Sequence, residues 1–364
     1  MSRSIPFLEL APMHADLADE LKVKFAKLLE KGLFSGGEEV DALEKTMREY
    51  LNVPHAIPCA NGTDALELAL RALEIGPDDE VIVPALTWVS TAEVVSMVGA
   101  KVVFCDVDGH GLMDLLQLPS LLTARTRAII PVHLYGKMVN MERLLKLTVN
   151  TGIHVIEDAA QAFGAVQRGR SAGTYGAIGC FSFYPTKNLG ALGEAGLLVV
   201  QDAALAEKLR LLLNHGQSRR DRHEIVGRNG RVDTLQAAFL NVKFPYFEAW
   251  QQKRKGLAKS YLDHLQHLKG ITVPSSIVEE DHNAHLFTIQ TVQRDALKAY
   301  LAEKGIGTAV HYPLPVTAMR AFKVNKEFPV ASRLSNLTLS LPLHPYLHED
   351  DVRRVCEEVQ RFFQ

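Results

Sequence analysis

Two carboxylates and an amide follow an apolar run near the middle of this 364-residue sequence, in the segment Glu157-Asp158-Ala-Ala-Gln161. A carboxylate at the exit of a buried strand is unfavourable unless it has a partner or a use. It could keep a pyridinium nitrogen protonated, bind a metal ion, or cap the helix that follows. Taken alone, the segment fits a helix cap best.

A lysine follows a second apolar run, in the segment Ser182-Phe-Tyr-Pro-Thr-Lys187-Asn-Leu-Gly190. An amine that is partly removed from water has a lowered pKa and becomes a nucleophile towards an aldehyde, which is the requirement for a Schiff base. Taken alone, a lysine after a strand is more often a solvated loop residue.

Two further segments follow strand candidates. Gly62 and Thr63 lie in a polar turn that offers backbone N–H groups to a phosphate, although a plain helix N-cap has the same pattern. Trp88, one of two tryptophans, could lie against a planar ring, although tryptophan at a strand end is more often core. Together the four segments supply phosphate donors, a stacking face, an acid and an amine, the groups that hold one pyridoxal phosphate.

Seven apolar runs, separated by stretches of helical period, must position these groups. The runs span residues 55–60, 80–85, 101–107, 128–134, 154–160, 178–184 and 195–201. This alternation predicts an α/β protein whose mostly parallel seven-stranded sheet is covered by helices in a three-layer α/β/α large domain. The four segments would then meet at the edge where strands end and helices begin, which is where such sheets bind ligands.

Beyond residue 246 the pattern changes to isolated strand candidates, at residues 271–273, 285–292 and 308–312, and amphipathic helices. The last helix, predicted over residues 348–363, places its valines and one cysteine on a single face. We therefore predict a cofactor-binding large domain over residues 1–245 and a smaller α+β domain over residues 246–364.

Composition excludes several classes of protein. The chain is 47% hydrophobic and has a formal net charge of −2, so it has neither the basic excess of a nucleic-acid-binding protein nor a polybasic membrane patch. The four cysteines are far apart and form no CxxC pair, which predicts buried reduced thiols and no metal site. No stretch approaches the length of a membrane span, so a cytoplasmic protein is expected.

The sequence resembles the sugar aminotransferases of the DegT/DnrJ/EryC1/StrS family, fold-type I pyridoxal-phosphate enzymes, along essentially the whole chain. The segments that carry the resemblance are residues 35–44, 61–65, 157–162, 182–190, 227–238 and 341–345. The resemblance implies that Lys187 forms the Schiff base with the cofactor and that Asp158 pairs with the pyridine nitrogen. It also implies that Gln161 contacts the ring hydroxyl and that Trp88 stacks on the ring.

The phosphate site implied by the resemblance is shared between two chains. Gly62, Thr63 and Ser182 would bind the phosphate from one subunit, and Asn229 would reach it from the other. The active site therefore implies a homodimer.

The substrate is inferred from the resemblance alone. Residues 215–220, 231–238 and 309–315 look most like those of enzymes that aminate UDP-2-acetamido-2-deoxy-3-oxo-glucuronate at carbon 3, with L-glutamate as donor, for lipopolysaccharide and O-antigen synthesis. In that subgroup His311, Tyr312 and the partner chain's Arg231 lie by the sugar. Ping-pong kinetics follow from an amine that is first left on the cofactor and then passed to the keto sugar.

Several alternatives stay open at this point. The acceptor could be a dTDP-linked 3-keto-6-deoxyhexose, or the amine could go to carbon 4. A non-catalytic regulator could use the same pocket to bind a nucleotide sugar, although a binding module has no need of Lys187. The related dehydratases carry histidine in place of that lysine, and a cysteine desulfurase would need a cysteine in a catalytic loop. The sequence leaves open the nucleotide, the carbon aminated, whether the sugar carries a carboxylate, and any oligomer beyond the dimer.

Overall fold

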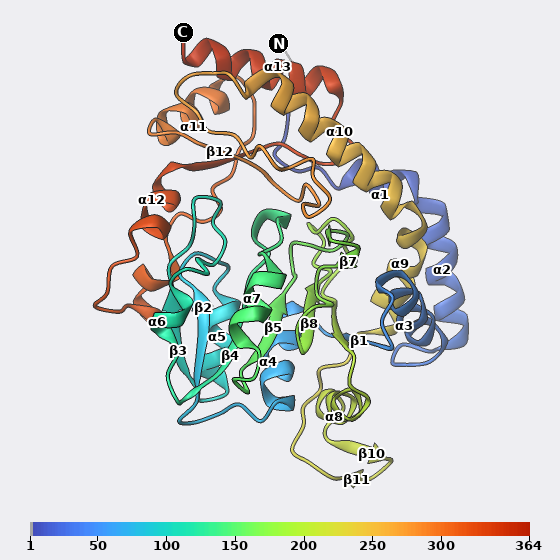
Figure 1. Ribbon diagram of the computed structural model, residues 1–364. Helices are drawn as coiled ribbons and strands as arrows, with labels where there is room; N and C mark the ends of the chain where they lie inside the picture. The colour runs from blue at the N-terminus through green and yellow to red at the C-terminus, as the bar shows by residue number, and fades with distance from the viewer. Residues whose placement is uncertain (1–2) are drawn as a thin grey trace.

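The computed structural model describes residues 3–364 and contains one seven-stranded sheet in the order β1-β9-β8-β5-β4-β2-β3 (Figure 1). The strands are β1 (His55–Cys59), β2 (Glu80–Pro84), β3 (Lys101–Cys105), β4 (Thr126–Ile129), β5 (His154–Asp158), β8 (Ile178–Ser182) and β9 (Gly196–Val200). Each overlaps one of the seven predicted runs. The predicted α/β class and seven-stranded sheet are confirmed.

The sheet is parallel except at β9, which runs antiparallel to both of its neighbours, β1 and β8. Strand β5 pairs in parallel with β8, so that Asp158 lies opposite Cys180. Because β1, β2, β5 and β8 end at the same edge, the segments that follow them are brought together there.

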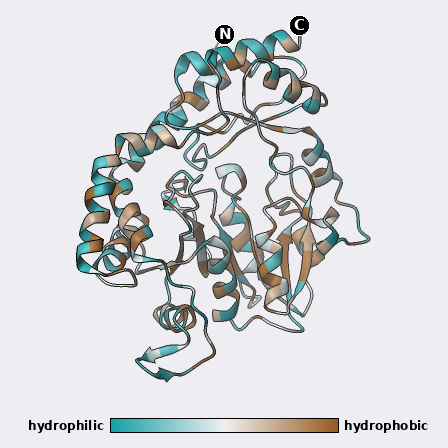
Figure 2. Cartoon of the chain, turned by 180° about the vertical axis from the view of Figure 1, so that it is seen from behind, coloured by the Kyte–Doolittle hydropathy of each residue, from teal (hydrophilic) through white to brown (hydrophobic). Residues whose placement is uncertain are grey.

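Helices pack on the faces of the sheet and complete the three layers (Figure 1). The helices of this part are α1 (Ala11–Asp16), α2 (Ala18–Lys31), α3 (Glu38–Leu51), α4 (Gly62–Ala72), α5 (Ser90–Met97), α6 (Leu118–Leu121), α7 (Met141–Thr148), α8 (Ala203–Leu213) and α9 (Thr234–Lys243). Two short hairpins, β6 (Val166–Gln167) with β7 (Arg170–Ser171) and β10 (Gln217–Arg219) with β11 (Arg222–His223), lie outside the sheet. The sheet strands are coloured mainly as hydrophobic in Figure 2, as expected for strands covered on both faces.

Most of the remaining elements lie at the top of Figure 1, together with both ends of the chain, while α10 runs from there down the right side and α12 lies at the left. These elements are α10 (Phe247–Leu265), β12 (Phe287–Gln290), α11 (Arg294–Glu303), α12 (Pro329–Leu337), β13 (Thr338–Leu341) and α13 (Glu349–Phe362). Helix α13 matches the predicted C-terminal helix, and Val352, Val355, Cys356 and Val359 on its apolar face are all fully buried.

Two of the predicted strands in this region do not form. Residues 271–273 and 308–312 each make one isolated bridge, Thr272 to Gln290 and Ala309 to Ser340. The partner of β12 is instead β13, which was not predicted. Its four residues follow α12 directly, so the helical period before it hides the start of the strand.

The structure has two main hydrophobic cores, one around the sheet and one between α10, α13 and the β12–β13 pair. Ile5 lies in the second core and bridges Ile306, so the beginning of the chain packs with its end. Conversely, Val316 and Phe328 pack against the first core. The domain boundary near residue 246 stays a prediction.

All four cysteines are buried and unpaired. Within residues 3–364, no helix combines the length and the apolar character needed to cross a lipid bilayer.

Candidate active site

The turn after β1 and the end of β8 are in close contact at the edge of the sheet. A Cβ atom on Gly62 would lie 2.8 Å from the Cβ of Ser182, so only glycine allows this approach. The Oδ1 of Asn61 accepts a 2.8 Å bond from the N–H of Asp64 and caps α4. The N–H groups of Gly62 and Thr63 lie in the first turn, where a helix offers no internal partner. This corner can bind an anion.

Asp158 ends β5 and is 6% exposed. Its Oδ2 accepts a 2.8 Å bond from the hydroxyl of Thr91, and its Oδ1 accepts a 3.2 Å bond from the N–H of Ala160. Burial raises the pKa of Asp158, and these two bonds together with the charge of Lys187 oppose that rise. The next element is the hairpin strand β6, so the interpretation of Asp158 as a helix cap is wrong.

The neighbouring carboxylate, Glu157, points into the protein and is fully buried. Its Oε2 accepts bonds from the N–H of Gly173 (2.9 Å) and from Nε2 of His133 (3.0 Å). Its Oε1 accepts bonds from the N–H groups of Tyr175 and Gly176, both at 2.6 Å. Four donors therefore hold this carboxylate as part of the framework, and it has no free face for a ligand.

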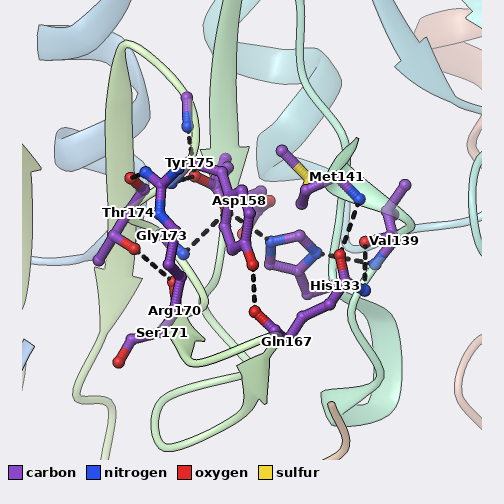
Figure 3. A network of polar contacts seen from close by, with 12 residues as sticks. His133, Val139, Met141, Asp158, Gln167, Arg170, Ser171, Gly173, Thr174 and Tyr175 are labelled. Atoms are coloured by element: carbon purple, nitrogen blue, oxygen red, sulfur yellow. Dashed lines mark hydrogen bonds and ion pairs between the residues drawn. The ribbon is translucent and has the colours of Figure 1, made fainter. Parts of the chain in front are cut away.

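His133 connects this framework to Asp158 (Figure 3). Its Nδ1 accepts a 3.2 Å bond from the N–H of Val139, so the ring proton lies on Nε2 and is donated to Glu157. The N–H of His133 donates to the carbonyl of Asp158 at 3.0 Å. The buried polar network of Glu157 and His133 therefore holds the backbone that carries Asp158.

Gln161 joins the loop after β5 to the predicted sugar site. Its Oε1 accepts a 2.6 Å bond from the N–H of Tyr135, and its Nε2 donates a 3.0 Å bond to the hydroxyl of Tyr312. The hydroxyl of Tyr135 donates to the carbonyl of His311. The structure thus places His311 and Tyr312, which come from the far end of the chain, beside Gln161.

Trp88 is 58% exposed, so the interpretation of this residue as core is wrong. Its ring centre lies 5.7 Å from that of Tyr312, with the rings inclined at 45°. A large exposed ring at the strand edge is available to a planar ligand.

Lys187 lies in the loop after β8, where its N–H donates to the carbonyl of Tyr184 at 2.8 Å. Part of the side chain stays exposed, but burial of the amine lowers the pKa of Lys187 to about 8, with Asp158 opposing the change. Lys187 also affects the pKa of His311. Burial first, and then the charge of Lys187, lower the pKa of His311 to about 4. A lysine in these surroundings differs from the solvated loop residue that the sequence alone allowed.

Asn229 and Arg231 are exposed and stand apart from these groups. The segment runs beside the end of β1, and Arg231 donates to Oδ1 of Asn229 at 3.2 Å and to the hydroxyl of Ser35 at 3.1 Å. They line a polar cavity of about 520 Å³ together with Asn61 and other residues, and neither Lys187 nor Asp158 is part of its wall. Within residues 3–364 of a single chain, the structure does not bring Asn229 and Arg231 to Lys187.

Three residues near these groups, Thr91, Asn188 and His285, were not predicted from the sequence. Thr91 follows Thr87 by one helical turn and bonds to it at 3.0 Å, a spacing that could have drawn attention to the pair around Trp88. Asn188 bonds to His285, which is 97 residues away in the sequence, so no local spacing could have shown that contact.

The chain matches the description "DegT/DnrJ/EryC1/StrS aminotransferase family" over residues 15–360. It belongs to this family. One relative, a UDP-N-acetyl-3-dehydro-α-D-glucosamine 3-aminotransferase of Acidithiobacillus ferrooxidans, is 43% identical and covers 98% of each chain. A dTDP-3-amino-3,4,6-trideoxy-α-D-glucose transaminase of Streptomyces venezuelae is 39% identical over 98% of this chain and 96% of its own. A UDP-2-acetamido-2-deoxy-3-oxo-D-glucuronate aminotransferase of Pseudomonas aeruginosa is 38% identical over 97% and 98%.

Solved structures agree with this membership. DesV of S. venezuelae superposes with a TM-score of 0.96 at 39% identity, over 100% of this chain and 99% of that one. NtdA of Bacillus subtilis, solved with bound cofactor PMP, superposes with a TM-score of 0.95 at 28% identity, over 100% and 86%. The predicted family, enzyme class and cofactor are confirmed: the protein is a pyridoxal-phosphate-dependent nucleotide-sugar aminotransferase.

The residues of this aminotransferase fit its cofactor. The anion-binding corner at Gly62 suits a phosphate, the fixed carboxylate of Asp158 suits a protonated ring nitrogen, and Lys187 has a pKa that makes its amine available. The exposed face of Trp88 suits the ring.

Proposed function

We propose that the enzyme transfers an amino group from L-glutamate to carbon 3 of a UDP-linked 3-keto sugar, UDP-2-acetamido-2-deoxy-3-oxo-glucuronate. The observation that carries the proposal is the bond from Gln161 to Tyr312, because it joins the segment that resembles a sugar site to the cofactor side. The P. aeruginosa relative, whose name specifies this acceptor, supports it. Under this proposal the reaction takes place in the cytoplasm, and the amino sugar that it forms is a precursor of a surface polysaccharide.

Each residue of the site has a role under this proposal. Bound pyridoxal phosphate supplies the sink for the electrons released when the donor loses its α-proton. Asp158, held by Thr91 and Ala160, keeps its carboxylate aimed where a positive ring nitrogen can form, and that charge favours its ionised form. Lys187 would hold the cofactor, and its amine would move a proton between donor and cofactor, because its lowered pKa lets it both accept and release a proton near neutral pH.

We further propose that the enzyme is a homodimer in which Asn229 and Arg231 complete the partner's site. Both side chains are exposed and line a polar cavity, which is the position of groups that meet a ligand or a second chain. Arg231 is bonded to a neutral amide and a hydroxyl, so its charge is free to meet a phosphate or carboxylate.

A second acceptor, the neutral 3-keto sugar UDP-N-acetyl-3-dehydro-glucosamine, is favoured by a specific observation. The A. ferrooxidans relative, at 43% identity, is named for it. His311 is moreover a neutral group at physiological pH, since burial holds its pKa near 4, so this histidine supplies no positive charge to a sugar carboxylate. Recognition of a uronic acid would then depend on Arg231.

The acceptor is tested by loading the enzyme with pyridoxamine phosphate and measuring single turnovers with three keto sugars. The uronate and neutral UDP sugars and a dTDP-linked 3-keto-6-deoxyhexose are compared. We expect the UDP-linked uronate to discharge the amine fastest. Faster discharge by the neutral UDP sugar would favour the second candidate, and discharge by the dTDP sugar alone would contradict both. Steady-state kinetics with glutamate as donor should be ping-pong.

A further inference from the structure

A short chain of buried hydroxyl groups ends at the carboxylate of Asp158. Thr91, in the first turn of α5, is fully buried, and its hydroxyl donates to Oδ2 of Asp158 at 2.8 Å. Thr87 precedes α5 and is 1% exposed, and its hydroxyl lies 3.0 Å from that of Thr91. Within residues 3–364 this is the only hydrogen bond of the Thr87 side chain.

The chain has a single direction when Asp158 is ionised. A hydroxyl carries one proton and an ionised carboxylate can only accept, so the proton of Thr91 is used at Oδ2. The proton between the two threonines must then come from Thr87. The carbonyl of Trp88, 3.2 Å from the hydroxyl of Thr91, is a longer and uncharged alternative acceptor. Thr87 therefore donates to Thr91, and Thr91 donates to Asp158.

Hydroxyl donors in series stabilise a negative charge at the end of their chain. Each hydrogen bond polarises the next one, and the interaction is stronger where water is excluded. Burial raises the pKa of Asp158, and the bond from Thr91 is the largest cause that opposes this rise, ahead of the bond from the N–H of Ala160. The hydroxyl chain thus offsets part of the cost of burying this charge.

Titratable groups from other parts of the chain also face this carboxylate. They are His133, Lys187, Cys180 on the neighbouring strand β8, and Tyr312. Burial raises the pKa of both the Cys180 thiol and the Tyr312 hydroxyl, so these two groups are uncharged at neutral pH. Lys187, whose pKa is about 8, is a cation that also favours the ionised carboxylate. A test of the threonines must therefore leave Lys187 unchanged.

We propose that Thr91 and Thr87 are positioning residues for Asp158: their directed hydroxyl chain stabilises the ionised carboxylate, so that the proton shared with the cofactor stays on the ring nitrogen. The inference rests on the proposed pairing of Asp158 with that nitrogen. A protonated nitrogen lets the cofactor ring accept electrons. Without the two donors the carboxylate is a stronger base and draws the proton to itself.

The test uses valine, which has the branched shape of threonine but no hydroxyl. Thr91→Val removes the donor to Asp158, whereas Thr87→Val removes only the donor behind it. Thr91→Ser keeps the hydroxyl. The matched control is Thr148→Val, at a buried threonine whose hydroxyl bonds to carbonyls of its own helix α7.

The first measurement is the pH at which Asp158 titrates in the cofactor-free protein. Carbon-13 NMR of aspartate labelled at the carboxyl carbon follows this titration, and Asp158→Asn identifies the signal. Loss of a donor to the ionised form raises a carboxyl pKa, so the midpoint should rise by about one pH unit in Thr91→Val and by about 0.3 in Thr87→Val. Thr91→Ser and Thr148→Val should keep the wild-type midpoint. Lys187 is present in every variant, so the differences report the hydroxyl chain.

The second measurement is the protonation of the ring nitrogen in protein loaded with ¹⁵N-labelled pyridoxal phosphate. The ¹⁵N chemical shift separates a protonated ring from a neutral one. We expect a protonated ring in the wild type, a shift towards the neutral ring in Thr91→Val, and the wild-type signal in Thr91→Ser and Thr148→Val. A change in packing alone leaves the proton where it is, so this shift separates the proposed role from a purely structural one.

The two measurements separate the possible failures. A neutral ring in the wild type would overturn the pairing of Asp158 with the nitrogen, and the titration of the cofactor-free protein would then decide the hydroxyl chain by itself. An unchanged midpoint in Thr91→Val would overturn the chain. A midpoint that rises in Thr91→Val and not in Thr87→Val would overturn the role of Thr87. If Thr91→Val does not fold, Thr87→Val, which leaves the bond to Asp158 in place, decides the proposal.

Discussion

The cofactor side of the site and the substrate side are built in different ways. Asp158 and Gln161, on the cofactor side, are at most 8% exposed, and two hydrogen bonds hold each side chain. Arg231, on the substrate side, is exposed. Buried, fully bonded groups keep one geometry, whereas exposed residues on loops can change without disturbing the core. This difference fits a family whose members share the amine chemistry and accept both UDP- and dTDP-linked sugars.

The largest effect should come from the cofactor side. Lys187→Ala removes the amine that binds the cofactor, and we expect turnover to fall by about 10⁴-fold or more. Purified protein should also lose the absorbance band of the Schiff base and its shift on addition of glutamate. A variant that kept both colour and turnover would break the assignment of the lysine.

The charge of Asp158 is the next test of the same side. Asp158→Asn keeps the size of the side chain, and the bond from Thr91 can persist, but the negative charge is lost. We expect kcat to fall about 10³-fold with little change in melting temperature.

Asp106→Asn is the matched control for this charge. Asp106 is 4% exposed and caps α12 by accepting from the N–H groups of Val330 and Ala331, at 3.0 and 2.9 Å. That variant should lose about 1 kcal/mol of stability in a denaturant titration and keep kcat within a few fold. Equal losses of kcat in Asp158→Asn and Asp106→Asn would show that kcat depends on the loss of a buried charge as such, and not on the position of that charge.

The substrate side should respond more weakly and through KM. Arg231→Ala is expected to lower kcat/KM for the UDP-linked uronate by about 10- to 100-fold, since a charged hydrogen bond is lost, while capture of the cofactor stays unchanged. Mixing this variant with Lys187→Ala should restore activity to about a quarter of the wild type, because random reassortment leaves one intact site in half of the dimers. No recovery after mixing would contradict a shared site.

The smallest effect is expected at Trp88, where the two sides meet. Trp88→Ala should weaken cofactor binding by about tenfold, and Trp88→Phe should restore most of the loss, because the contact is a ring face. Fluorescence titration of the cofactor-free protein measures both. If Trp88→Ala changed only KM for the sugar, the residue would belong to the substrate side alone.

Features that depend on local sequence patterns were predicted more fully than features that depend on their surroundings. Local periodicity along the chain predicts the seven strand runs and the apolar face of α13, and both are found in the structure. It also predicts that Asp158 ends a strand and that Lys187 follows one, which the structure shows as well. Strand β13 was missed, because the helix directly before it masks the short signal of a four-residue strand.

What the sequence determined by itself is a sheet edge that carries an acid, an amine and a phosphate turn, because strand period and turn chemistry are local properties of the chain. Only the tertiary structure decided the environment of each group. Burial and the proximity of Asp158 set the pKa of Lys187, and contacts across more than 90 residues brought His285 to Asn188 and Tyr312 to Gln161. Such contacts depend on how packed elements exclude water around particular atoms, which no spacing along the chain records.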